Sequence, residues 1–208
     1  DGAAGESVLR SIRNGLAYVW QDVRLRGFFI LIGIATLFIN GPITIGIPAL
    51  ADARLPEGAA AFGILMSTFG GGSLLGLVLA GVAPRPPERF MGIMLGAVWS
   101  GMGIGMALLG LAQSTPLAAL LTLVIGASNG YVSILFITWL QRRTPDHLMG
   151  RVMSVLMFAS VGLIPVSHAL TGSLLGASIT AVFIGAGVIF VLLVAGAMFN
   201  PLLRSLED

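Results

Sequence analysis

Residues 27–50 read GFFILIGIATLFINGPITIGIPAL and contain no Asp, Glu, Lys or Arg. A bilayer core of about 30 Å is crossed by roughly 20 apolar residues in a helix, so this stretch is long enough to span a membrane. Five further segments of similar length and hydrophobicity follow it. We therefore predict an all-α polytopic membrane protein with six transmembrane helices, over residues 27–50, 60–82, 90–112, 117–140, 149–172 and 177–200.

The six predicted helices form one transmembrane domain, residues 27–200, between two shorter parts. Residues 1–26 place apolar side chains at helical spacing with arginines on other faces. This pattern predicts a cytoplasmic lead-in helix, either in the headgroup layer or packed as a plain cytosolic helix on loops. Residues 201–208 are a predicted cytoplasmic tail. A mean hydropathy of +0.98 with 10% charged residues agrees with a membrane protein.

The arginines are distributed unequally between the two sides of the predicted helices. Arg54 alone falls on one side. The other side receives Arg10, Arg13, Arg24, Arg26, Arg85, Arg89, Arg142, Arg143, Arg151 and Arg204. The positive-inside rule assigns this richer side to the cytoplasm, so we predict an inner-membrane protein with both termini cytoplasmic. The net charge is only +2, which argues against a nucleic-acid partner.

An internal repeat relates the first and second predicted helices to the fourth and fifth. An offset of 89 residues places Asn40-Gly41 on Asn129-Gly130, and an offset of 91 places Leu65-Met66 on Leu156-Met157. The third and sixth helices give no convincing match. Because each copy has three helices, the two copies must have opposite orientations in the membrane. The sequence thus predicts a 3+3 inverted repeat, which is an architecture of secondary transporters.

Several short motifs carry a resemblance to a known family. They are the lead-in at 11–22, Arg24-Leu25-Arg26, Gln141-Arg-Arg-Thr-Pro-Asp146, Gly150-Arg-Val-Met-Ser154 and Gly162-Leu-Ile-Pro165. With them the whole chain resembles the C-terminal six-helix half of a major facilitator superfamily transporter, and within that family bacterial exporters of the macrolide and siderophore efflux type. The loop at 76–89 lacks the Asp of the superfamily's cytoplasmic-loop motif, which argues against a gating ion pair centred there.

The resemblance has consequences for the partners and the activity of the chain. Such transporters have twelve helices, so it implies a further N-terminal six-helix half, in the same polypeptide or in a partner chain. It also implies that the first, second, fourth and fifth helices face a central cavity. The implied function is export of hydrophobic or amphipathic small molecules by alternating access.

Polar residues inside the apolar segments are the candidate substrate pathway. They recur at helical spacing in the first and fourth predicted helices: Thr36, Asn40, Thr44, Thr122, Asn129 and Ser133. Amides in the middle of a membrane usually face protein or a water-filled cavity, because they are costly without a partner. Two interpretations stay open. One is a substrate-facing patch near the midplane, and the other is hydrogen bonding between helices, worth about 0.6 kcal/mol each. The glycine that follows each asparagine also weakens the helix locally.

Five other residues are candidates for particular roles. His168 is a candidate proton relay or substrate contact, with an interfacial or hydrogen-bonded histidine as the alternative. Met157 ends a stripe of methionines that suits varied apolar ligands or ordinary packing. Arg142, Arg143 and Arg151 set the topology, and contact with an acidic residue of the implied half would make them a cytoplasmic gate.

Two other function classes compete with transport. Ser128 in Gly126-Ala-Ser-Asn-Gly130 is reminiscent of intramembrane serine proteases, but the sixth predicted helix has no histidine to activate a serine. A membrane anchor or assembly subunit without transport is the other class. The sequence has no cysteines, which excludes thiolate metal sites and cysteine nucleophiles, and no phosphate-binding Gly-Lys-Ser/Thr loop of an ATP-driven motor. We predict no catalytic residues, no metal site and no cofactor.

Overall fold

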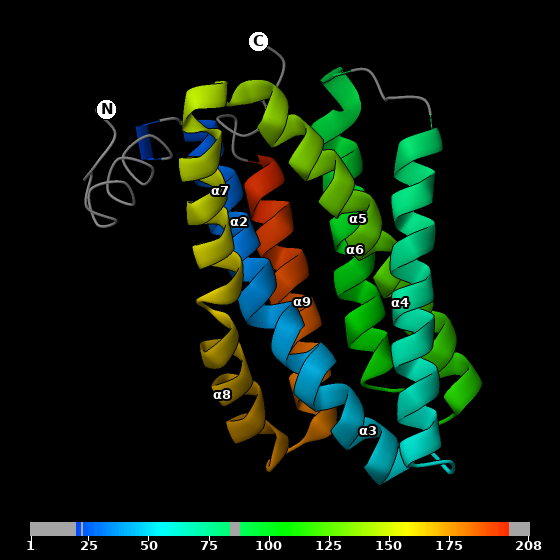
Figure 1. Ribbon diagram of the computed structural model, residues 1–208. Coiled ribbons are helices and arrows are strands. Elements are labelled where there is room, and N and C mark those ends of the chain that lie inside the picture. The colour runs from blue at the N-terminus through cyan, green and yellow to red at the C-terminus, as the bar shows by residue number, and fades with distance from the viewer. Residues whose placement is uncertain (1–19, 22, 84–87, 200–208) are drawn as a thin grey trace, which may run out of the picture.

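The structure is a computed structural model and describes residues 20–21, 23–83 and 88–199. Within these ranges the chain contains six helical spans that are long and apolar enough to cross a membrane. Figure 1 shows them as one bundle of long helices that run alternately up and down. Each predicted segment falls on one of the six, which confirms the predicted fold class. The predicted lead-in helix lies almost entirely outside the described residues.

The first span is helical throughout but changes its type of helix midway. It consists of α2 (Val23–Ala35), the π-helical turns η1 (Thr36–Asn40) and η2 (Pro42–Gly46), and α3 (Ile47–Arg54). The Ile47 N–H donates to the carbonyl of Pro42, five residues back, where an α-helix would use the residue four back. The two π-turns lie on either side of Gly41, where the sequence predicted a weakened helix.

The other five spans are α-helical, and one of them is broken. They comprise α4 (Ala59–Val82), α5 (Glu88–Leu109), α6 (Thr115–Arg143), α7 (Asp146–Val161) with α8 (Ile164–Leu175), and α9 (Ile179–Phe199). The break between α7 and α8 falls at Gly162-Leu163, just before Pro165, which is favoured in the first turn of a helix. The third helix ends at Leu109 and does not continue to residue 112 as predicted.

The contacts between the helices are the same when the two repeats are interchanged. The second span, α4, packs along the fourth, α6, and the fifth span packs along the first. The third span, α5, contacts α6, and the sixth, α9, contacts η1 and η2 of the first. The third and sixth spans contact each other. Exchanging first with fourth, second with fifth and third with sixth reproduces every one of these pairings, as an inverted repeat requires.

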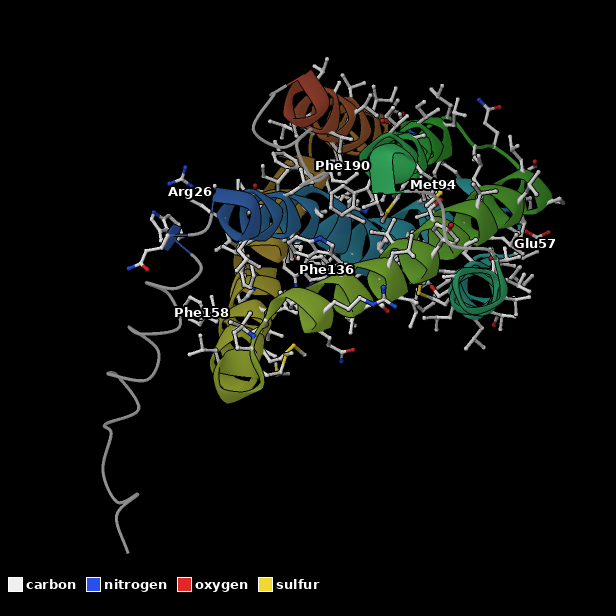
Figure 2. All side chains as sticks on the ribbon, turned by 90° about the horizontal axis from the view of Figure 1, so that it is seen from above. Arg26, Glu57, Met94, Phe136, Phe158 and Phe190 are labelled. Atoms are coloured by element: carbon white, nitrogen blue, oxygen red, sulfur yellow. The ribbon has the colours of Figure 1, made fainter. Side chains whose placement is uncertain are left out.

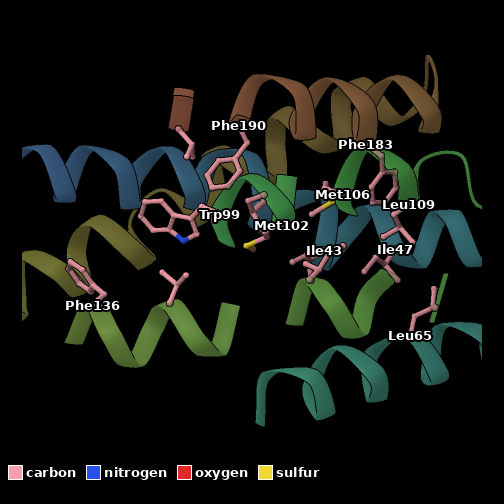
Figure 3. Close-up of a cluster of buried hydrophobic side chains, with 14 of the residues drawn as sticks. Ile43, Ile47, Leu65, Trp99, Met102, Met106, Leu109, Phe136, Phe183 and Phe190 are labelled. Carbon is pink, nitrogen blue, oxygen red and sulfur yellow. The ribbon is translucent and has the colours of Figure 1, made fainter. Parts of the chain in front are cut away.

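The centre of the bundle is filled by large apolar side chains. Figure 3 shows side chains of the first span meeting those of α5 and α9. Trp99 of α5 and Phe190 of α9 contact edge to face, with ring centroids 6.2 Å apart. Figure 2 shows Phe190 inside the bundle, whereas Phe158 of α7 lies at its margin and is 79% exposed. The exposed apolar surface of the fifth span therefore faces lipid or another set of helices.

Candidate functional site

The contact between the first and fifth spans is built around the hydroxyl of Ser167. Its Oγ accepts a hydrogen bond from Gly41 N–H at 2.8 Å and donates one to the carbonyl of Leu37 at 2.7 Å. In an α-helix these two backbone groups would bond to each other, because their residues are four apart. The Ser167 hydroxyl is therefore inserted into the hydrogen-bond ladder of the first span, which is a known cause of a local helix distortion.

Two neighbours of this insertion explain why the helix tolerates it. Gly41 lies so close to α8 that a Cβ atom there would be 2.5 Å from the Ser167 carbonyl oxygen and would overlap the Thr171 hydroxyl. Pro42 has no N–H, so the carbonyl of Phe38 also loses the donor that an α-helix would supply. Glycine thus permits the close approach, and proline weakens the ladder at the same place.

Thr44 and His168 meet at the same contact. The Thr44 hydroxyl donates to the carbonyl of Asn40 at 2.7 Å and lies 2.7 Å from Nε2 of His168. Since a hydroxyl has one proton, both bonds are satisfied together when Nε2 carries a proton and donates. In that tautomer Nδ1 carries no proton and can accept a hydrogen bond. Two residues that the sequence placed in separate candidate roles are thus in direct contact.

Asn40 and Asn129 are half-buried residues. Among the described residues, neither amide has a hydrogen-bond partner, and neither bonds to the other. Ser133 donates its hydroxyl to the carbonyl of Asn129 within α6, at 2.7 Å. Thr36 is half-buried at the start of η1. Of the predicted polar set in the first span, Thr44 is thus the residue that the structure joins to another span.

The contact between α4 and α6 is a close approach of two backbones. Cβ atoms on four glycines would overlap backbone atoms of the facing helix: Gly72, Gly76, Gly126 and Gly130. Thr122, a candidate pathway residue by its sequence spacing, is buried here, and its hydroxyl lies 2.7 Å from that of Thr68. Its role is therefore a hydrogen bond between helices. Gly130 packs against Ser73 of α4 and does not loosen α6, which remains α-helical from Thr115 to Arg143.

The other predicted residues lie apart from these contacts. Met157 of α7 is exposed, with 65% of its surface accessible. Arg142 is exposed near the end of α6. Arg143 and Arg151 lie in α6 and α7, and their side chains are outside the described residues.

Sequence reasoning missed a polar anchor at the opposite end of the first span. The Arg54 guanidinium donates to the carbonyl of Gly110 at 2.8 Å and to the Thr180 hydroxyl at 2.6 Å. Nearby, the Thr115 hydroxyl donates to the Glu57 carboxylate. From the sequence, Arg54 could be assigned only to one side of the membrane. Its partners could not be identified, because they are a backbone carbonyl and a hydroxyl in distant parts of the chain. These bonds fix the end of α3 to the third and sixth spans.

These side chains suit binding and movement and not covalent chemistry. Among the described residues, no group of His, Asp and Glu is placed to hold a metal ion. Ser128, the candidate nucleophile, lies in α6, whereas His168 pairs with Thr44 on another pair of spans. The site instead offers hydroxyl, amide and imidazole groups along apolar helices.

Comparison with known proteins identifies the family. The model for the Major Facilitator Superfamily matches residues 2–167. The multidrug efflux pump Tap of Mycolicibacterium fortuitum is 28% identical over 204 residues, which are 97% of this chain and 49% of that protein. The enterobactin exporter EntS of Escherichia coli is 27% identical over 177 residues, or 85% of this chain and 41% of that protein. No solved structure matches.

The matched length agrees with the six spans. The chain spans about half the length of the curated relatives that it matches. The match confirms the predicted family. Because this family consists of transporters, the prediction that the chain is not an enzyme is also confirmed. With six membrane-length helices and a family model that matches most of its residues, the chain belongs to the Major Facilitator Superfamily.

Proposed function

We propose that this chain is the C-terminal six-helix half of a secondary transporter that exports hydrophobic or amphipathic small molecules by alternating access. One observation carries the proposal: a six-span chain that matches about half of two exporters and pairs its helices as an inverted repeat. The complementary N-terminal half, in the same polypeptide or as a partner chain, would cover the exposed apolar faces of α4 and the fifth span. Both termini would lie in the cytoplasm, as the arginine distribution favours.

The substrate pathway that we propose follows the polar residues of the first, fourth and fifth spans. Its members are Thr36, Asn40, Thr44, Asn129, Ser133 and His168, together with the apolar Met157. Amides without described partners support this role for Asn40 and Asn129, because a polar group in a membrane span requires a partner, water or ligand. The Nδ1 atom of His168, free of the bond to Thr44, would contact a substrate or a proton. Arg142, Arg143 and Arg151 would form the cytoplasmic gate.

Efflux measurements test the proposal. Cells that produce this chain with its complementary half should expel amphipathic fluorescent dyes faster than cells that produce either half alone. Asn40→Ala and Asn129→Ala should each change the apparent affinity or the rate for at least one dye, with unchanged membrane insertion. Thr122→Val is the matched control, since its hydroxyl is buried between α4 and α6.

Two outcomes would contradict the proposal. If no pairing with a complementary half produced efflux of any dye or catecholate siderophore tested, an anchor or assembly role would be favoured. If both asparagine variants transported every substrate like the parent, the proposed pathway would lose its basis.

A further inference from the structure

We propose that Ser167 is a positioning residue that holds the first span in its widened π-helical form and so places Thr44 against His168. When α8 moves away, we infer that Gly41 N–H returns to the carbonyl of Leu37 and the widened turn closes. This inference deepens the transporter proposal and rests on it for the role of the movement in transport. The two helical states themselves are a property of this chain.

The hydrogen bonds allow both states without an unsatisfied backbone group at Leu37 or Gly41. An unpaired N–H or carbonyl is strongly unfavourable in a membrane interior. With Ser167 in place, Gly41 N–H and Leu37 C=O each bond to its hydroxyl. With Ser167 withdrawn, the same two groups can bond to each other, as the α-helical ladder requires. An element whose groups at Leu37 and Gly41 are paired in two discrete arrangements can act as a two-state switch.

The fifth span is suited to such a withdrawal. Its helix is interrupted at Gly162-Leu163, four residues before the inserted hydroxyl. A Cβ on Gly33 of α2 would lie 3.2 Å from the Leu163 side chain, so the interruption itself contacts the first span. A break of this kind lets α8 move without carrying all of α7, because a few residues at an element's end can absorb the change in backbone angles.

Closing the π-turn has a defined geometric consequence. A π-turn contains one residue more than an α-helical turn, so its loss turns the two flanking helices relative to each other by about 100°. Arg54 fixes the end of α3 through Gly110 and Thr180. The rotation should therefore appear in α2. The Thr44–His168 contact lies on the α3 side of Gly41 and is lost through the movement of α8 itself.

Distances between spin labels test this directly. The chain has no cysteines, so single cysteines can be introduced at Ile30 in α2, at Asp52 in α3 and, as a reference, at Ile104 in α5; all three are exposed. In lipid nanodiscs, Ser167→Ala should shift the Ile30–Ile104 distance by several ångström, up to about 8 Å for a label on a helix surface turned by about 100°. The Asp52–Ile104 distance should not change.

Three further variants make the test specific. Ser167→Thr keeps a hydroxyl and, unlike Ser167→Ala, should keep the Ile30–Ile104 distance of the parent. Ser173→Ala, on the same helix, removes a hydroxyl that bonds within α8 to the Leu170 carbonyl, and it should change neither distance. Pro42→Ala supplies the missing N–H without touching Ser167 and should shift the Ile30–Ile104 distance in the same direction as Ser167→Ala.

The proposal is overturned if folded Ser167→Ala and Pro42→Ala proteins both keep the parent distances. It is also overturned if Ser173→Ala produces the same shift, because the effect would then reflect general loosening of α8. Should Ser167→Ala not fold, the Pro42→Ala and Ser167→Thr measurements decide alone. No transport is needed for any of these distances, so a failure here is distinguishable from a failure of the transporter proposal.

Discussion

The α4–α6 contact and the contact between the first and fifth spans occupy equivalent places in the two repeats but are built differently. Gly76 and Ser167 are related by the 91-residue offset of the repeat. A Cβ on Gly76 would meet the backbone of Ala127 and Tyr131, two residues four apart on α6. The Ser167 hydroxyl meets Leu37 and Gly41, two residues four apart on the first span. At the equivalent point of helix contact, the side chain is the hydrogen atom of Gly76 in one repeat and the hydroxymethyl group of Ser167 in the other.

This difference, together with Pro42, separates a helix that stays α-helical from one that contains π-turns. Against Gly76, α6 keeps its own ladder and is α-helical along its whole length. Against Ser167, the first span exchanges a bond of its ladder for bonds to its neighbour and widens into π-turns. One contact therefore fixes two helices by close packing, whereas the other couples the shape of a helix to the position of its neighbour.

The largest expected effect comes from filling the α4–α6 contact. Gly130→Leu would force a side chain into the backbone of Ser73, where no flexible group can yield. Overpacking of this kind typically destabilises by about 1–3 kcal/mol and occasionally more, and we expect about 3 kcal/mol or more here. Thermal unfolding in detergent, followed by size-exclusion chromatography, measures the loss.

Gly81→Ala is the matched control for that variant. Gly81 lies in α4, and a Cβ there would meet nothing within 4 Å. Its unfolding temperature should stay close to that of the parent. Equal loss in the two variants would show that an added side chain destabilises these helices even outside the contact, and the close contact would not be special.

A smaller effect should follow removal of the Arg54 anchor. Arg54→Gln would leave the Gly110 carbonyl and the Thr180 hydroxyl without their charged donor. Hydrogen bonds to charged groups are worth about 1.5–3 kcal/mol, so we expect a loss of about 2 kcal/mol. Arg142→Gln, at an exposed position, should leave the unfolding temperature unchanged. A neutral Arg54→Gln would mean that the end of α3 is held by packing alone.

The smallest effect concerns the hydroxyl pair between α4 and α6. A double-mutant cycle with Thr68→Val and Thr122→Val isolates their mutual bond, in which one hydroxyl donates to the other while the other donates within its own helix. Membrane hydrogen bonds of this kind average about 0.6 kcal/mol, and we expect a coupling of that size. A coupling near about 2 kcal/mol would exceed the largest values measured for such bonds and would show that hydroxyls, and not glycine packing, hold this contact together.

The six spans could be predicted from sequence because each is a largely apolar stretch of membrane length, with Arg151 near the start of the fifth as the one charged residue, and hydropathy depends only on composition. The weak point near Asn40-Gly41 could be predicted for a similar reason, since Gly41 and Pro42 are local signals of a weakened ladder. The inverted repeat could be predicted because identical residues remain at equivalent positions of the two halves of the sequence. The pairing of the helices in the structure agrees with that repeat.

The contacts themselves could not be predicted. Ser167 lies 126 residues from Gly41, and its hydroxyl becomes a backbone partner only once the two spans are placed in register. Arg54 bonds to a carbonyl that any residue at position 110 would provide. Thr122 resembled a pathway residue, and Gly130 a weak point of its helix, because sequence shows the face of a helix but not which neighbour covers it.

Thiol cross-linking within the chain, assembled with its complementary half, tests most directly whether the two contacts differ in function. Thr68→Cys with Thr122→Cys joins α4 to α6 where the native oxygen atoms are 2.7 Å apart. Gly33→Cys with Leu163→Cys joins the first span to the interruption of the fifth, where a Cβ and a side-chain carbon would be 3.2 Å apart. We predict that closing the first pair leaves dye efflux near that of the reduced protein, and that closing the second stops efflux until the bond is reduced. Efflux that survives closure of the second pair, or that both closures stop equally, would contradict the account.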